Sequence, residues 1–307
     1  MTSLGACFHS VTYVVTDLDR AMRRFSALVP GAIFSRSSTR LEPIGGGSPG
    51  AVALQCAVAP VGPHGEYEIR LVQPLTRDAL FHRLLETAGP GPHHVGLRVP
   101  DLHSAAQRLG RGRSAAAELR GEDGRAHLFY RCDEIGGLFE LSEGPAVRDP
   151  GVGLLAAHFM QVAYVVNDIG AARGWAQEVL GCEIAAARDI VQGPSWNLRF
   201  RGKPVPYDFR MKMVVGKIGA AGQSQIELLE PERGENVLAE FLRERGPGLN
   251  HIAFSVPDYL GMTAALRATG VAPLKEIHVP GMVHSSYFDC SAEQLGTIEV
   301  FEAGPHA

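Results

Sequence analysis

The stretch QVAYVVND at residues 161–168 decides the fold, because the same pattern occurs three more times in the chain. The other copies are SVTYVVTD at 10–17, HVGLRVPD at 94–101 and HIAFSVPD at 251–258. Each copy is rich in β-branched or aromatic residues whose side chains would alternate between two faces, which predicts a strand. Each ends in Val-x-Asp, and an Asp between a strand and an apolar-periodic stretch is a natural N-cap for a helix. The four copies therefore predict a repeated unit that opens with strand, turn and helix.

Each unit also ends in a strand with a characteristic sequence. These strands are EIRLVQPL around Arg70, GLFELSEGP around Glu140, QIELLEPE around Glu227 and TIEVFEAGP around Glu299. The first and third tails resemble each other, as do the second and fourth, which indicates a duplicated pair of units. We expect an N-terminal domain at 1–148 with modules 7–75 and 92–145, and a C-terminal domain at 153–307 with modules 158–232 and 249–303. Pro150 and Gly151 mark the expected linker between them.

The composition indicates a globular protein that acts on a small molecule. The chain has 307 residues, of which 45% are hydrophobic and 20% charged, and its net charge is -4. No run of basic residues with interleaved aromatics occurs, so nucleic acid is not expected as a partner. Five widely spaced cysteines predict neither a disulfide framework nor a thiolate zinc site. No export signal and no apolar run of about eighteen residues is found, so we expect a cytoplasmic protein, monomer or homodimer, without a membrane partner.

A strand that opens with His or Gln, a Val-x-Asp that leads into a helix, and a late Ile-Glu-Leu-x-Glu strand resemble the vicinal oxygen chelate superfamily. This superfamily includes glyoxalase I and methylmalonyl-CoA epimerase, and the resemblance covers all four modules. It implies an α+β fold of four βαβββ modules, paired into two glyoxalase-like domains with cupped mixed sheets. It also implies a metal held by the first-strand and late-strand residues of paired modules. In the C-terminal half these residues are Gln161, Glu227, His251 and Glu299, in the order found in many glyoxalase I enzymes.

The chemistry of these four residues supports a metal site. Strand alternation places Gln161 on one face with Ala163 and Val165, and the other three polar residues lie on otherwise core-like strands. Charged groups are rarely buried without a partner, and one divalent cation per chain would satisfy all four. The mixed nitrogen and oxygen set suits Zn, Ni, Co, Fe(II) or Mn.

Such an ion can bind two adjacent substrate oxygens and stabilise the enediolate formed when a neighbouring C–H loses its proton. The resemblance implies that Glu299 is the base, with Glu227 as the second candidate.

The N-terminal half departs from the pattern, with Ser10, Arg70, His94 and Glu140 at the equivalent positions. Arg70 cannot ligate a metal, and we expect it to form an ion pair with Glu140 instead. No metal is expected in this half. His9 lies one residue before Ser10, so regular alternation would point it to the opposite face of the strand.

Five further residues are candidates for substrate binding. Arg199, Arg210 and Lys212 lie on predicted strands, where they bind an anion if they face the cup and are merely solvated if they do not. The segment EIHVPGMVHSSYFDC at 276–290 is interpreted as a Gly-containing loop, either a lid over the cup or an ordinary surface loop. As a lid it would bring His284 to the substrate as a proton carrier. Tyr287 in this segment is either a substrate contact or a core residue.

Three functions compete. The first is a metal-dependent isomerase or lyase that removes a proton next to a carbonyl group. The second is an extradiol-type dioxygenase, which needs two histidines and one carboxylate around Fe(II), whereas Gln161 and Glu227 stand where histidine is expected. The third is a metal-free protein that binds a small molecule or antibiotic. The sequence leaves open the substrate, the metal, the choice among these classes, the role of the N-terminal half and the oligomeric state.

Overall fold

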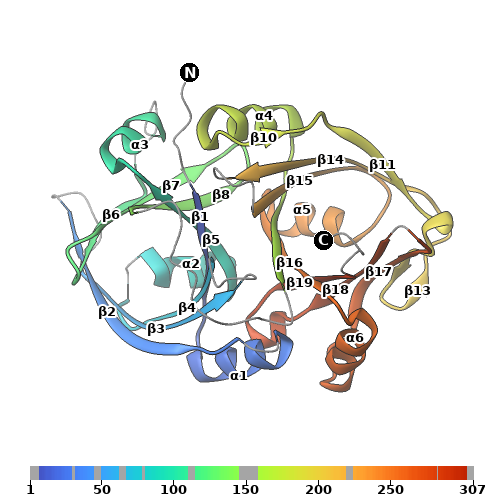
Figure 1. The fold of residues 1–307 in the computed structure, drawn as a ribbon, viewed down its shortest axis with the longest axis horizontal. Helices are drawn as coiled ribbons and strands as arrows, with labels where there is room; N and C mark the ends of the chain where they lie inside the picture. Colours follow the sequence, from blue (N-terminus) through green and yellow to red (C-terminus); the bar gives the residue numbers. More distant parts are fainter. Residues whose placement is uncertain are drawn as a thin grey trace.

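The two halves of the chain form two curled sheets that lie side by side, with the N-terminal half in blue to green and the C-terminal half in yellow to red (Figure 1). The fold is α+β, with four βαβββ modules paired into two domains, each with one curled sheet, as predicted. The computed structural model describes residues 7–29, 32–44, 50–61, 67–77, 80–109, 115–144, 158–218, 224–281 and 283–302. The predicted linker at Pro150 and Gly151 lies outside these residues.

The N-terminal sheet closes into a barrel of eight strands in the order β1-β4-β3-β2-β6-β7-β8-β5. The first strands of its two modules run antiparallel, and each pairs in parallel with the last strand of its own module. Its elements are β1 (Cys7–Val14), α1 (Leu18–Leu28), β2 (Ser35–Pro43), β3 (Val52–Val61), β4 (Tyr67–Pro74), α2 (Leu80–Ala88), β5 (Gly91–Val99), α3 (Leu102–Leu109), β6 (Ala117–Gly121), β7 (Ala126–Cys132) and β8 (Gly137–Glu143).

The C-terminal sheet repeats this arrangement but stays open, because β17 pairs with the short β12–β13 hairpin. A π-helical turn at Ala176–Leu180 extends α4 and ends at Gly181, whose φ is 70°. The elements are β9 (His158–Val165), α4 (Ile169–Trp175), β10 (Glu183–Ile184), β11 (Arg188–Gln192), β12 (Arg199–Phe200), β13 (Lys203–Pro204), β14 (Phe209–Ile218), β15 (Ser224–Arg233), α5 (Val237–Arg245), β16 (Gly248–Val256), α6 (Tyr259–Ala268), β17 (Pro273–Val279), β18 (Val283–Asp289) and β19 (Thr297–Glu302).

The four Val-x-Asp aspartates cap the helices that follow them. Asp17, Asp101, Asp168 and Asp258 each accept a hydrogen bond from the backbone N–H three residues further on. Such a cap satisfies one of the free N–H groups at a helix start and contributes about 1 kcal/mol. The predicted strand, turn and helix at the start of each module are confirmed.

The two halves share one continuous hydrophobic core between the sheets. Phe25 of α1 packs edge-on against Phe254 of β16, and Phe139 of β8 stacks on Tyr164 of β9. Phe139 also contacts Trp175 of α4. Truncating one such buried aromatic residue to alanine costs about 3–5 kcal/mol, so these contacts hold the halves in a fixed relation.

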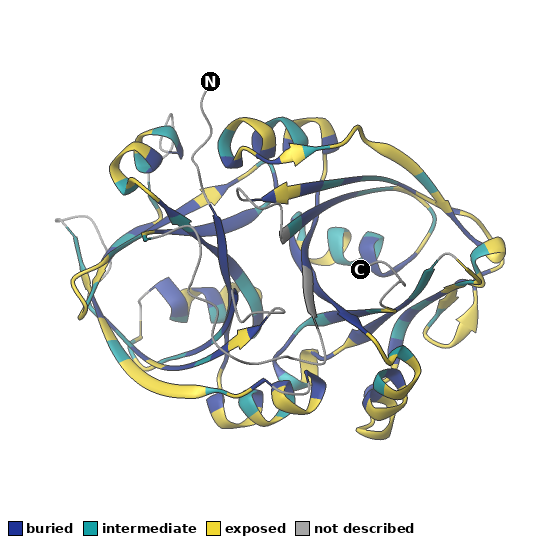
Figure 2. Cartoon of the chain, in the orientation of Figure 1, coloured by how far each residue is buried: buried dark blue, intermediate teal, exposed yellow. Residues whose placement is uncertain are grey.

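Each sheet also curls around one helix, α2 in the N-terminal half and α5 in the C-terminal half (Figure 1). Phe81 of α2 contacts Phe129 of β7, and Leu238 of α5 packs with Val165 and Met211. These helices bury one part of each interior with apolar side chains, and Figure 2 shows the buried residues on the sides of the strands and helices that face inward. The remaining part of each interior is where the polar side chains gather.

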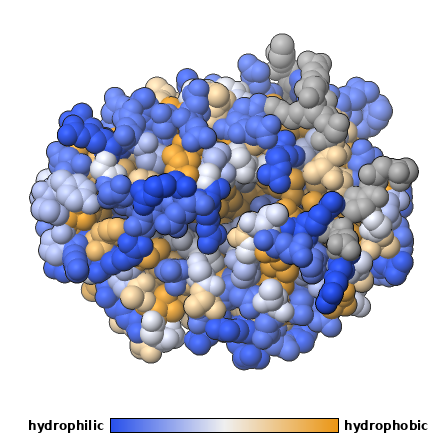
Figure 3. Space-filling model, turned by 180° about the vertical axis from the view of Figure 1, so that it is seen from behind, coloured by the Kyte–Doolittle hydropathy of each residue, from blue (hydrophilic) through white to orange (hydrophobic). Residues whose placement is uncertain are grey.

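Figure 3 shows one face of the molecule, on which hydrophilic residues predominate. On the face seen in Figure 3, hydrophobic residues appear as separate patches among hydrophilic ones. Within the described part of the chain, no helix has the length and apolar character needed to cross a bilayer.

The segment at 276–290 differs from the prediction, because it is not a loop over the cup. It forms a hairpin of β17 and β18 with a tight turn at Gly281, whose φ is 72°. The alternating apolar residues on both sides of Pro280 and Gly281 favour paired strands, so the interpretation of this segment as a loop, whether lid or surface loop, is wrong. Met282 of that segment lies outside the described residues.

Candidate metal centre

The strand register brings the four predicted ligands together on the inner face of the C-terminal sheet. Glu227 of β15 and His251 of β16 both pair with Ala163 of β9, one from each side. Gln161 of β9 and Glu299 of β19 both pair with the alanine two residues beyond His251 on β16. The four side chains thus occupy two adjacent cross-strand rows on one face, as regular strand alternation predicts.

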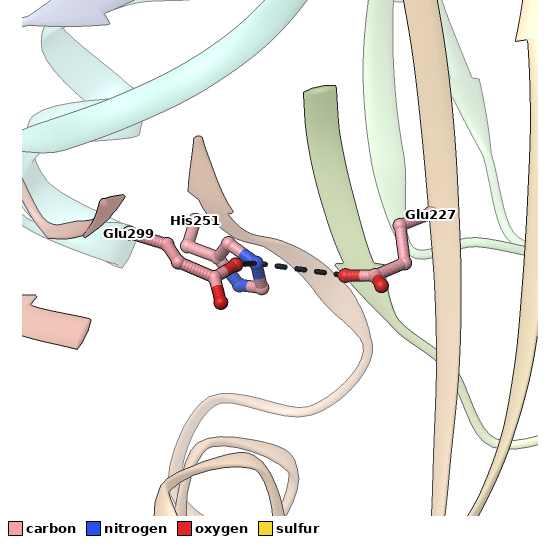
Figure 4. Close-up of side chains that lie close together, drawn as sticks. All are labelled: Glu227, His251 and Glu299. Carbon is pink, nitrogen blue, oxygen red and sulfur yellow. Dashed lines mark ion pairs between the residues drawn. The ribbon is translucent and has the colours of Figure 1, made fainter. Parts of the chain in front are cut away.

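All four side chains are buried, with total exposures of 7% or less. Glu227, His251 and Glu299 each offer a ligand atom, and these atoms lie within 4.8 Å of one another. The His251 Nε2 is 3.0 Å from Glu299 Oε2 and 3.6 Å from Glu227 Oε2, and Figure 4 shows the two carboxylates approaching the ring from opposite sides. The Gln161 amide nitrogen donates to Glu227 Oε2 at 3.0 Å, so its amide group reaches the same point.

Neighbouring side chains fix the orientation of these groups. The Nδ1 of His251 lies 2.8 Å from the side-chain oxygen of Asn250, which can only accept, so Nδ1 carries the proton. The lone pair of Nε2 therefore faces the two carboxylates. Ser285 donates its hydroxyl to Glu299 Oε1. Partners of this kind orient metal-ligating histidines and carboxylates in general.

Orphaned atoms at the centre fit a cation. His251 Nε2 and Glu299 Oε2 are buried, face each other at 3.0 Å and have no hydrogen-bond partner with proper geometry among the described residues. Burial and the charge of Glu299 raise the pKa of Glu227 to about 8. A divalent cation would pair with the imidazole lone pair and both carboxylates at once, and this donor set suits it.

Lys275 of β17 is a member of the site that the sequence did not reveal. Its side chain is buried, and its Nζ has no hydrogen-bond partner among the described residues and lies 4.7 Å from the centroid of the Tyr287 ring. Burial lowers the pKa of Lys275 to about 8, whereas the charges of Glu299 and Glu227 raise it. The only sequence signal is that Lys275 alternates with the buried Pro273 and Ile277, which becomes useful once the strand is known.

Of the five predicted substrate contacts, only Tyr287 lies at this site. Its ring packs edge-on against His251 with 4.8 Å between centroids, and burial raises its pKa well above the usual value. Arg199 is exposed and donates to a backbone carbonyl of its own turn. Arg210 and Lys212 lie on the face of β14 opposite the methionines that pack inside the cup. His284 lies on the outer side of β18 and pairs with Glu302 of β19.

The N-terminal half repeats the same register with different side chains. Arg70 and His94 both pair with Thr12, while Ser10 and Glu140 both pair with a glycine of β5. The expected ion pair is present, with Arg70 Nη1 at 3.1 Å from Glu140 Oε2. The neighbouring guanidinium and the hydrogen bonds from two histidines hold the pKa of Glu140 well below its usual range. A fixed cation thus stands beside this carboxylate.

The side chain of His9 does not follow the prediction. A β-bulge between Phe8 and Ser10 interrupts the alternation, so His9 points into the barrel, 3.0 Å from Arg98 Nη2 and 3.4 Å from Glu68. The expectation that it faces outward is wrong, because a bulge adds one residue to the strand without changing faces. A bulge of this kind cannot be read from one sequence.

Comparisons with known proteins agree with this architecture. A family model described as the glyoxalase/bleomycin resistance protein/dioxygenase superfamily matches residues 9–130 and 160–288. A search of curated protein sequences gives no significant match. A mutant of 4-hydroxymandelate synthase from Streptomyces coelicolor, 17% identical, aligns over 97% of this chain and 92% of its own with a TM-score of 0.65.

Two further solved structures are similar to this chain over different lengths. A fusion of a xylose isomerase-like TIM barrel with 4-hydroxyphenylpyruvate dioxygenase is 16% identical and covers 97% of this chain with 49% of its own, at a TM-score of 0.51. Methylmalonyl-CoA epimerase from Mycobacterium tuberculosis is 21% identical over 48% of this chain and 89% of its own, at a TM-score of 0.37. At such identities, the two full-length alignments bear on the fold alone.

Proposed function

The chain belongs to the glyoxalase/bleomycin resistance protein/dioxygenase superfamily, and from this premise we propose that it is a metal-dependent isomerase or lyase that removes a proton next to a carbonyl group. The observation that carries this proposal is the convergence of Glu227, His251 and Glu299 on one buried point, with Gln161 beside them. Two carboxylates balance the charge of one divalent cation, and the imidazole and the amide oxygen complete a mixed ligand set.

The bound cation would supply electrostatic stabilisation for negative charge that develops on substrate oxygens. Gln161, Glu227, His251 and Glu299 would hold it, and Asn250 would keep the His251 ring in the tautomer that can ligate.

The two carboxylates have different surroundings, which bears on which of them accepts the proton. Glu299 is fixed by Ser285 and faces His251, and its side chain is 1% exposed. Glu227 accepts a hydrogen bond from Gln161 alone among the contacts described, and its side chain is 9% exposed. A base must be able to reach the substrate, so these surroundings favour Glu227 as the base and Glu299 as the fixed ligand. This reverses the order that the family resemblance implies.

Lys275 would orient the substrate through its charge. The ammonium group is buried beside Tyr287, and none of its N–H groups donates to a described residue. Once a divalent cation neutralises Glu227 and Glu299, Lys275 leaves one positive charge in a buried site, and such a charge requires a partner. We infer that the substrate brings negative charge close to Lys275, either as a carboxylate or as the oxyanion formed during proton removal.

Proton exchange tests the proposed reaction directly. The protein loaded with Zn, Ni, Co, Fe(II) or Mn is incubated in D2O with a panel of 2-hydroxy ketones, 2-oxo acids and acyl thioesters, and deuterium incorporation is followed by NMR. We expect exchange at the carbon next to the carbonyl group, abolished by a chelator and reduced at least about a hundredfold in Glu227→Gln. Glu302→Gln, an exposed position on the same strand as Glu299, is the matched control and should exchange normally.

The two other functions give different results in the same experiment. Oxygen uptake with Fe(II) and no deuterium exchange would support a dioxygenase. A protein that takes up no metal but binds a small molecule unchanged would support a sequestering role, and either result would reject the isomerase or lyase.

A further inference from the structure

The N-terminal barrel encloses a cavity of about 360 Å³, although its residues cannot form the metal site of the other half. This volume falls in the range of ligand pockets for small metabolites. One side of the wall is charged, with Arg70, Arg98 and Glu68, and the other is apolar, with Leu54 and Phe129. The interior therefore separates a polar region from an apolar one within a single closed barrel.

Arg70 presents a free hydrogen-bonding edge to this cavity. Its Nη1 donates to both carboxylate oxygens of Glu140, at 3.1 and 3.4 Å. The Nε and Nη2 groups donate to no residue in the part of the barrel that the structure describes, and 28% of the side chain is exposed, against 5% for Glu140. The Nε and Nη2 edge of a guanidinium matches the two oxygens of a carboxylate, so Arg70 can pair with a second anion while it keeps Glu140.

A second unsatisfied group points to the same ligand. The Thr12 side chain lines the cavity, is 2% exposed, and its hydroxyl has no hydrogen-bond partner among the described residues. Thr12 pairs directly with Arg70 across β1 and β4, so the hydroxyl and the guanidinium project from adjacent positions on the same face. Buried polar groups without partners are uncommon, and the Thr12 hydroxyl is such a group beside the free edge of Arg70.

The charges of the wall disfavour a ligand with two negative charges. Three arginines and four carboxylates line the cavity, so the wall has no net positive charge to hold a dianion such as phosphate. A monocarboxylate forms a bidentate ion pair with Arg70, and only one negative charge has to be desolvated when it binds.

The apolar wall indicates the rest of the ligand. Phe81 of the helix α2 and Phe129 of β7 meet edge-on at 5.8 Å between centroids, and both line the cavity together with Leu41 and Leu54. Such a wall suits an aliphatic or aromatic body rather than a sugar or a nucleotide. We propose that the N-terminal barrel is a second binding site, for a small monocarboxylate with an apolar body, held by the free edge of Arg70.

Binding of phenylacetate in the presence of EDTA tests this site, with phenylacetamide and inorganic phosphate as comparison probes. Isothermal titration calorimetry and ligand-observed NMR should detect phenylacetate and neither of the other two. Arg70→Lys keeps a cation beside Glu140 but loses the bidentate edge, so binding should weaken at least about tenfold. Arg36→Lys, an exposed arginine of β2, is the matched control. Glu299→Gln in the other half should bind phenylacetate as the wild-type chain does.

Val58→Trp gives an independent check, because this residue lines the cavity and a larger side chain would fill it. Far-UV circular dichroism establishes that each variant is folded before it is scored. The proposal is overturned if the folded wild-type chain does not bind phenylacetate, or if it binds phosphate in its place. It is also overturned if folded Val58→Trp or folded Arg70→Lys binds phenylacetate as tightly as the wild-type chain. Loss of binding in Glu299→Gln would move the site to the C-terminal half and also overturn it.

Discussion

Replacing Glu227 by Gln should change the stability of the protein in opposite directions with and without a bound metal. Glu227 and Glu299 are buried carboxylates at one point, and burial together with the charge of Glu299 raises the pKa of Glu227 from 4.5 to about 8. Between these values the unfolded chain has released the proton and the folded chain has not, so the free energy of unfolding falls as the pH rises from about 4.5 to 8.

The size of this effect follows from the pKa difference. Each tenfold change in proton affinity corresponds to about 1.4 kcal/mol, so the metal-free wild-type chain should lose about 3 kcal/mol by pH 7 relative to pH 4.5. The amide introduced by Glu227→Gln cannot ionise but still accepts the hydrogen bond from Gln161, so the variant should lack this loss. Lys275 does not change the stability between pH 4.5 and 7, because its pKa is about 8 in the folded chain and 10.5 in the unfolded chain. Its side chain is therefore protonated in both states over this range. Metal-free Glu227→Gln should thus be more stable than the wild-type chain at pH 7 and equal to it near pH 4.5.

A bound metal should reverse the order. A ligand at a hundredfold excess over its Kd stabilises the folded chain by about 3 kcal/mol, and the variant lacks one of the ligands that would provide this affinity. Urea denaturation at pH 4.5, 6 and 7, with EDTA or with a divalent metal ion at pH 7, measures both effects, and Glu302→Gln is the control. The reasoning would be refuted if metal-free Glu227→Gln is less stable than the metal-free wild-type chain at pH 7. It would also be refuted if the metal stabilises the variant as much as it stabilises the wild-type chain.

Three further changes probe single contacts. Lys275→Met removes the one unpaired positive charge among the described residues of the site. It should leave the metal content unchanged but weaken binding of the dianion oxalate to the metal-loaded protein at least about tenfold, as measured by calorimetry. Asn250→Ala should lower metal affinity by about 10–100-fold, as measured by competition with a coloured chelator, because His251 loses the partner that fixes its tautomer. Asp258→Ala should cost about 1 kcal/mol of stability in urea without a change in metal content, because it removes only the N-cap of α6.

The modules could be predicted from the sequence because their signals are local. A strand with alternating residues that ends in Val-x-Asp carries both the strand and the helix cap, and all four aspartates cap their helices. Closure of the sheets depends on long-range pairing and was not predictable. The barrel closes where β2 pairs with β6, whereas in the C-terminal half β17 pairs with the β12–β13 hairpin, and nothing local distinguishes these outcomes.

The candidate site shows the same division. Gln161, Glu227, His251 and Glu299 were predicted from the family resemblance, carried onto equivalent positions of the repeat. The strand register brings these positions together. Lys275 could not be predicted because its inward direction depends on where the β17 strand begins. The inward direction of His9 depends on a bulge, which has no signature in one sequence.

The metal content of the untagged protein tests the central claim most directly. Elemental analysis after dialysis against Zn, Ni, Co, Fe(II) or Mn should give about one equivalent per chain for the wild-type protein and for Glu140→Gln. A folded His251→Ala, Glu299→Gln double variant should retain less than about a tenth of that amount, because two of the four ligands are removed. A wild-type chain without bound metal, or a double variant that keeps it, would contradict a metal centre between the third and fourth modules.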